Sequence, residues 1–133
     1  MSKRLARSIP PRAAAILFST EDAREVRGLL ETYLSIDLAH QIMLREQGIV
    51  TPRCSARLIA GLLSIRSDVA DDLIGQAAPR GLYLLYEEYV GSRLGADLSG
   101  LLQTARSRND LSATAQRLMT RRSLYRAQLS LVR

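Results

Sequence analysis

The sequence predicts an all-α domain, an antiparallel arrangement of about four helices. Leu, Arg and Ala are the commonest of the 133 residues, whereas aromatic residues make up 5% and Trp is absent. This composition favours helices over strands. Apolar residues also recur at three- and four-residue spacing, in segments that open on capping residues and mostly close on glycine. The length is that of one domain.

The chain is predicted to begin with a basic, irregular arm over residues 1–18. Pro10 and Pro11 forbid a helix through that point. A single helical domain is then expected over residues 19–133. Its first helix should begin at the capping box formed by Ser19 and Asp22, and Gly48 should end it.

Two further helices are predicted in the middle of the chain. The second should begin at Thr51, a natural N-cap followed by a proline in the first helical position, and should continue to Gly75. The third should cover about Leu82 to Leu94. Residues 95–105, "GADLSGLLQTA", contain two glycines and are predicted to form a loop.

The last helix should start near Ser107 and run almost to Arg133, because apolar residues keep the helical spacing along that stretch. No C-terminal cap follows it. The domain is therefore predicted to end within a helix, which a partner or a further segment would complete.

Charge is unevenly distributed along the chain, which carries a net charge of +6. Both ends are basic and the middle is acidic. Residues 102–133 hold seven arginines against Asp110 alone. A cationic end of this kind can meet an anionic small molecule, a nucleic acid or an acidic patch on another subunit. Charge by itself does not choose among them.

Several classes of site and location are not expected. Cys54 is the only cysteine, so no internal disulfide is possible, which fits a cytoplasmic protein. No apolar run approaches the roughly 20 residues of a membrane helix. No metal site is predicted. We interpret His40 as a surface or packed helix residue and Cys54 as structural, and the acidic cluster as a solvated helix face. That cluster comprises Asp68, Asp71 and Asp72.

Five polar residues gather where the last helix opens: Arg106, Ser107, Arg108, Asn109 and Asp110. Ser107 and Asp110 form a capping box, which accounts for both at about 1 kcal/mol. Capping does not account for two arginines beside a helix N-terminus that already carries positive partial charge. Guanidinium groups together with free backbone amides are typical of an anion site. The residues alone leave two interpretations open, an anion site and a solvated surface turn.

The stretch "GLLQTARSRNDLSATAQRL" resembles the first signature segment of the argininosuccinate lyases, which read close to G-K-L-H-T-G-R-S-R-N-D-Q. These enzymes belong to the fumarase/aspartase superfamily. The resemblance spans most of residues 20–133 and is specific at 100–118. It implies the all-helical N-terminal part of such a lyase, in an oligomer and without a cofactor. The implied reaction, in amino-acid metabolism, is a β-elimination that releases fumarate.

The resemblance also implies roles for particular residues. Ser107, Arg108 and Asn109 would contact a dicarboxylate of the fumarate or succinyl type, with Arg106 and Thr104 in support. No catalytic acid or base is assigned within the chain. The family's other two signature segments, a Thr-His pair and a mobile serine loop, do not occur in it.

Four positions depart from the family's pattern. Gln103 stands where the family has histidine, and Tyr83 stands near the place of a family histidine upstream of Glu87. Ala105 replaces a glycine, and Leu111 replaces a glutamine. Each departure weakens the case for argininosuccinate itself as the substrate. Because the two further signature segments are absent, the chain alone is expected to be inactive. It would act as a fragment, a split subunit or a relic, with the acid and base supplied by a missing segment or by a second chain.

The alternative is a small basic helical module that binds nucleic acid or an acidic protein. Its support is the set of arginines along the last helix, at positions 117, 121, 122 and 126. Aromatic stacking residues are sparse and no nucleic-acid-binding motif occurs, so nucleic acid is not the expected partner.

Overall fold

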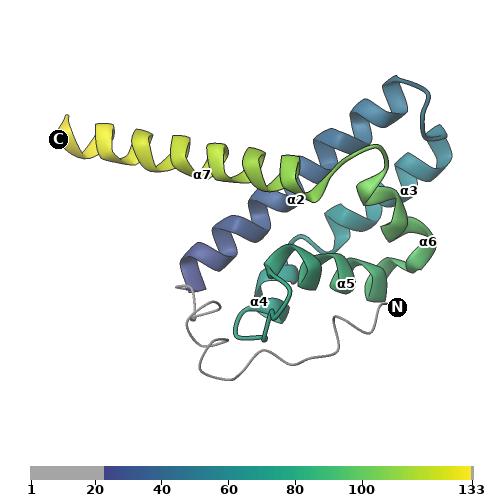
Figure 1. Ribbon diagram of the computed structural model, residues 1–133, viewed down its shortest axis with the longest axis horizontal. Coiled ribbons are helices and arrows are strands. Elements are labelled where there is room, and N and C mark those ends of the chain that lie inside the picture. Colours follow the sequence, from purple (N-terminus) through teal and green to yellow (C-terminus); the bar gives the residue numbers. More distant parts are fainter. Residues whose placement is uncertain (1–22, 133) are drawn as a thin grey trace.

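The computed structural model describes residues 23–132, which form helices and no strand, as predicted. The elements are α2 (Ala23–Glu46), α3 (Pro52–Ser64), α4 (Val69–Leu73), α5 (Leu82–Leu94), α6 (Ala96–Ser99), the 3-10 helix η2 (Gly100–Gln103) and α7 (Arg108–Leu131). Figure 1 shows α2 crossing the molecule, with α3 to α6 on one side of it and α7 on the other. The predicted arm and the capping box of Ser19 and Asp22 lie outside the described residues.

One apolar core joins α2, α3, α4 and α5. Leu30 and Leu34 of α2 pack with Leu58 and Leu62 of α3, and Tyr86 of α5 is fully buried among them. Three tyrosine rings, at positions 33, 83 and 86, pack edge to face or tilted, with ring centroids 5.0 to 6.2 Å apart. This packing fixes α2 against α5, the two helices that flank the loop described below.

The predicted second helix is interrupted, so its predicted extent to Gly75 is wrong. Thr51 caps α3 as expected, its side chain accepting from the Cys54 amide at 3.3 Å. The helix stops at Ser64, whose hydroxyl donates to the Gly61 carbonyl at 2.8 Å. Side-chain bonds of this kind compete with the helical ladder. After the turn, α4 packs against both α2 and α5.

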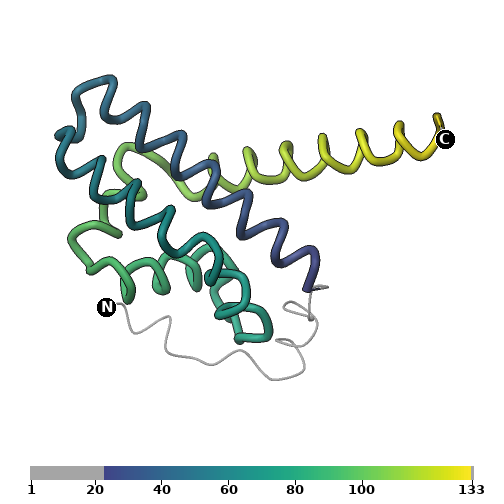
Figure 2. The backbone as a smooth tube through the Cα atoms, turned by 180° about the vertical axis from the view of Figure 1, so that it is seen from behind, coloured from purple at the N-terminus to yellow at the C-terminus, as the bar shows by residue number. Residues whose placement is uncertain are grey.

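Residues 95–103 also differ from the prediction, because most of the expected loop is wound into α6 and η2. Leu102 explains part of the difference. It is fully buried and belongs to the core, so the segment folds onto the body of the protein and satisfies its backbone through helical turns. The irregular stretch that remains before α7 is short and lies against α2 (Figures 1 and 2).

The last helix begins where the sequence predicts, with Ser107 as its N-cap. Leu111 and Ala115 in its first half are buried against the body, and Arg122 donates to the Thr32 hydroxyl of α2 at 3.1 Å. The C-terminal end of the helix extends away from the other helices (Figure 1). Its apolar side chains are exposed there, from Leu124 at 60% to Leu131 at 87%. Among residues 23–132, no helix is both long and apolar enough to span a membrane.

Candidate functional site

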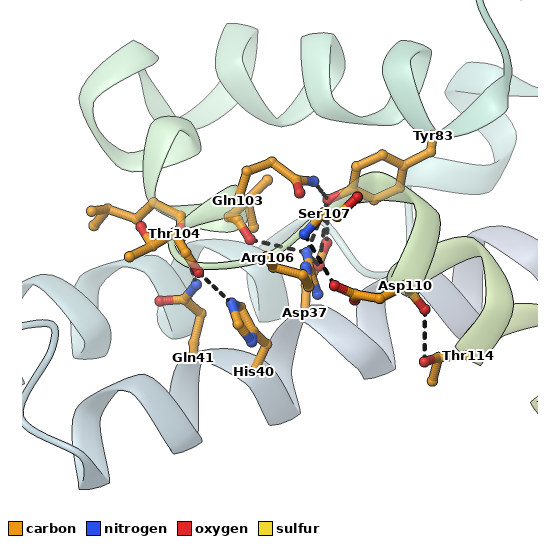
Figure 3. A network of polar contacts seen from close by, with 12 residues as sticks. Asp37, His40, Gln41, Tyr83, Gln103, Thr104, Arg106, Ser107, Asp110 and Thr114 are labelled. Carbon is orange, nitrogen blue, oxygen red and sulfur yellow. Dashed lines mark hydrogen bonds and ion pairs between the residues drawn. The ribbon is translucent and has the colours of Figure 1, made fainter.

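The segment that leads into α7 is fastened to one face of α2. Asp37 lies on that face together with His40 and Gln41, which follow it by three and four residues. Each of the three contacts a different part of the segment. Asp37 pairs with the Arg106 guanidinium. The His40 ring lies 2.9 Å from the Thr104 carbonyl oxygen. The Gln41 amide donates to the Leu101 carbonyl at 3.0 Å (Figure 3).

The Asp37–Arg106 ion pair is buried. The Asp37 side chain is fully buried, and the Arg106 side chain is 5% exposed. The same Arg106 nitrogen donates to the Leu102 carbonyl at 2.9 Å and to the Tyr83 hydroxyl at 3.2 Å. Burial raises the pKa of Asp37 to about 6, although Arg106 opposes this rise. Burial and the nearby Asp37 also raise the pKa of Tyr83.

Not every polar atom of this network has a partner. Nε and Nη1 of Arg106, together with Oε1 of Gln103, are buried and have no hydrogen-bond partner among the described residues. A partly satisfied buried network contributes less to stability than an apolar core of the same volume.

The capping box at the start of α7 is confirmed. The Ser107 hydroxyl accepts from the Asn109 amide at 3.1 Å, and the Asp110 carboxylate accepts from the Ser107 amide at 3.0 Å. These two bonds fix the backbone of the turn. The Ser107 hydroxyl keeps its own proton available for donation to a ligand.

The predicted contact residues fall into two groups. Ser107, Arg108 and Asn109 are exposed and follow one another around the first turn of α7, whereas Arg106 points into the protein. Arg108 is 52% exposed and donates to Glu87 of α5 at 2.9 Å. Thr104 is half-buried, and its carbonyl faces His40. The structure thus brings three predicted contacts together at the surface and sets the two supporting residues beneath them.

Two of the departures from the lyase pattern touch each other. The Gln103 amide donates to the Tyr83 hydroxyl at 2.7 Å, and this hydroxyl also meets the buried ion pair. A third departure, Ala105, is the one non-glycine residue of the described range with a positive φ, 54°. Glycine adopts that conformation without steric cost and alanine does not.

Asp37 and Gln41 were not predicted to belong to this site. Asp37 follows Tyr33 and Leu34 by four and three residues, so it lies within the apolar stripe of its helix. An ionisable residue inside a buried stripe requires a buried partner. The position of Asp37 therefore indicates a buried partner, but the sequence does not identify which arginine pairs with it.

Two carboxylates of the acidic cluster, Asp71 and Asp72, form ion pairs with residues outside this site. Asp71 pairs with Arg27, and Asp72 pairs with Arg93 while accepting from Tyr89. Within residues 23–132, no group of three or more His, Cys, Asp or Glu could hold a metal ion. Cys54 is a half-buried free thiol.

Two surface depressions lie apart from the loop. One runs along α7 beside Arg117 and Arg121. The other lies among α3, α5 and α6, beside Cys54 and Leu98. Neither is lined by residues 104–110. The turn at residues 107–109 is exposed at the surface.

Curated proteins named argininosuccinate lyase are similar to this chain. The one from Methanosarcina barkeri (strain Fusaro / DSM 804) is 32% identical over 109 residues, 82% of this chain and 22% of the relative. The one from Methanocaldococcus jannaschii is 31% identical over 130 residues, 98% of this chain and 26% of the relative. The one from Staphylococcus aureus (strain JH9) is 36% identical over 97 residues, 72% of this chain and 21% of the relative.

The similarity to these relatives places the chain among lyase-like proteins. Within them, it belongs to the argininosuccinate lyase family. It spans about a fifth to a quarter of the length of these curated relatives. No protein-family model matches the chain, and no solved structure does.

Proposed function

We propose that this chain is a component of an argininosuccinate-lyase-like enzyme and binds the dicarboxylate part of the substrate. Ser107, Arg108 and Asn109 make the contacts, and Arg106 and Thr104 support them from below. The substrate is an anionic dicarboxylate of the fumarate or succinyl type, and no cofactor takes part.

This proposal rests on one observation, that neighbouring residues of one short loop lie in two different environments. Its buried residues are tied to α2 and its next three residues are exposed together at the N-terminus of a 24-residue helix. A helix N-terminus favours anions, and an arginine there adds a two-pronged donor for a carboxylate. Loops that only close a turn do not require a buried ion pair beneath them.

This arrangement suits β-elimination that releases fumarate. A base removes the proton from the carbon next to a carboxylate, the carbon–nitrogen bond breaks, and an acid protonates the leaving nitrogen. Negative charge develops on the neighbouring carboxylate, where Arg108, Asn109 and Ser107 would stabilise it. The acid and base come from a further segment or a partner chain, because the one histidine, His40, is already engaged with the Thr104 carbonyl.

Two features support assembly with another surface, either a second copy or a different chain. The candidate site is open, and the outer half of α7 exposes Leu124, Tyr125 and Leu129 at 59% to 63%. Monomeric proteins rarely leave such a series uncovered. We place the assembly in the cytoplasm, since a single cysteine fits a reducing compartment, and in amino-acid metabolism, since the relatives are named argininosuccinate lyase.

The proposal is tested by thermal unfolding of the chain with fumarate. A ligand that binds only the folded state stabilises it, by about 1.4 kcal/mol at tenfold excess over its dissociation constant. Arg108→Ala and Asn109→Ala should each abolish this protection. Without ligand, the melting temperature should hardly move, because an exposed ion pair contributes less than about 1 kcal/mol.

The matched control is Arg121→Ala, which removes an exposed arginine farther along the same helix. It should keep full protection by fumarate. Unchanged protection in both loop variants, or its loss in the control, contradicts the assignment. Nucleic-acid binding that weakens steeply with salt would favour the basic-module alternative instead.

A further inference from the structure

We propose that Asp37 is a positioning residue of the dicarboxylate site, which it holds in shape through Arg106. Its part in binding rests on the function proposed above, whereas its part in anchoring the loop is independent of any ligand.

Asp37 reaches the site through a short chain of contacts. It lies in the middle of α2 and pairs with Arg106, 69 residues further along the chain. Arg106 directly precedes the N-cap Ser107, so a shift of its backbone moves the exposed turn. One Arg106 nitrogen bonds to Asp37, Tyr83 and Leu102 at once, which ties the loop to α2, α5 and η2.

The loop needs this restraint because its own sequence does not favour its shape. Ala105, directly before Arg106, has a φ of 54°. Alanine avoids this region, and such a conformation persists only where surrounding contacts impose it. The contacts on either side of Ala105 are the His40–Thr104 bond and the Asp37–Arg106 pair. Without Asp37, the backbone on the Arg106 side of Ala105 loses this restraint.

Stability alone is a weak reason for this pair. Two charged groups are buried, and two nitrogens of Arg106 lack partners among the described residues. Apolar residues of similar volume often stabilise a protein as well as, or better than, a buried ion pair. An ion pair does fix direction, which an apolar contact does not. The orientation of the loop is thus the role to test.

The first test compares wild type with Asp37→Asn by amide hydrogen exchange at pH 7. Exchange at Thr104, Arg106 and Ser107 should become roughly tenfold faster or more, whereas the amides of α3 and α5 should keep their protection. The matched control, Arg27→Ala/Asp71→Ala, removes an exposed ion pair between α2 and α4. It should leave exchange in the loop unchanged.

The second test measures fumarate affinity by calorimetry. Asp37→Asn should weaken it roughly tenfold or more, as for the loss of one hydrogen bond to a charged group. The groups facing Asp37 are Arg106 from the loop and Tyr83 and Tyr86 from α5. The pKa of Asp37 is about 6, so wild-type affinity should fall as pH drops below that value. The affinity of Asp37→Asn should not follow that profile.

A double variant keeps the test decisive if the single variant unfolds. Asp37→Leu/Arg106→Met fills the space with apolar groups and should melt at or above the wild-type temperature, yet lose fumarate affinity. If the folded variants keep both wild-type loop exchange and wild-type affinity, the positioning role is overturned. If exchange rises but affinity is unchanged, the link to binding is overturned. If the wild type itself does not bind fumarate, the proposed function fails, while exchange still decides the anchoring.

Discussion

Replacing Ala105 by glycine is expected to stabilise the protein. Ala105 has a φ of 54°, in the left-handed region, which costs an L-residue about 1–2 kcal/mol. Glycine removes that cost but gains freedom in the unfolded chain, which offsets about 0.4–1 kcal/mol. The free energy of unfolding should therefore rise by about 0.5–1 kcal/mol. The melting temperature should rise by about 2–4 °C for a domain of this size.

Urea unfolding at equilibrium measures this change directly, because the slope should stay constant while the midpoint moves. Ala113→Gly is the matched control, since Ala113 is exposed within α7. Glycine should cost about 1 kcal/mol there, as in other helix interiors. If Ala105→Gly loses as much as the control, Ala105 does not adopt the left-handed conformation and the account of the loop is wrong.

Three further outcomes are expected. Burial raises the pKa of Asp37 from 3.8 to about 6, so the folded state holds this proton more tightly than the unfolded state. Stability from this group is present below about pH 4 and is lost as pH rises through 6, by at most about 3 kcal/mol. Urea unfolding of wild type and Asp37→Asn from pH 4 to 7 checks this, and a wild-type advantage that grows with pH refutes it. Leu62→Ala should cost about 2–5 kcal/mol because Leu62 is fully buried, and a melting temperature close to wild type would count against the core described above. Gly95→Ala should cost about 1–3 kcal/mol, since Gly95 has a φ of 90°, and wild-type stability in calorimetry would contradict that geometry.

Sequence reasoning located the features of the fold that depend on neighbouring residues. The capping residues Thr51 and Ser107 do begin helices, because a cap bonds to amides two or three positions away. The break after Ser64 and the winding of residues 95–103 were missed. Both depend on where buried side chains such as Leu102 must lie in the assembled core, which periodicity along one segment does not report.

The candidate site also has residues that the sequence indicates and residues that only the fold reveals. The motif at 106–110 can be found in the sequence because its residues are adjacent. The resemblance to the lyases implies that three of them contact a dicarboxylate. The anchors were not visible, because Asp37 and Arg106 are 69 residues apart and His40 and Thr104 are 64 apart. Without the fold, Arg106 and Arg108 look alike. In the structure, Arg106 is buried and pairs with Asp37, whereas Arg108 is exposed and pairs with Glu87.

The central claim, that the turn at residues 107–109 grips a dicarboxylate, is tested most directly by nuclear magnetic resonance. Adding fumarate to the isotope-labelled chain should shift the amide signals of Ser107, Arg108 and Asn109 more than any others, and saturably. Shifts centred on the outer arginines of α7, or no saturable shift while the protein remains folded, would contradict the claim.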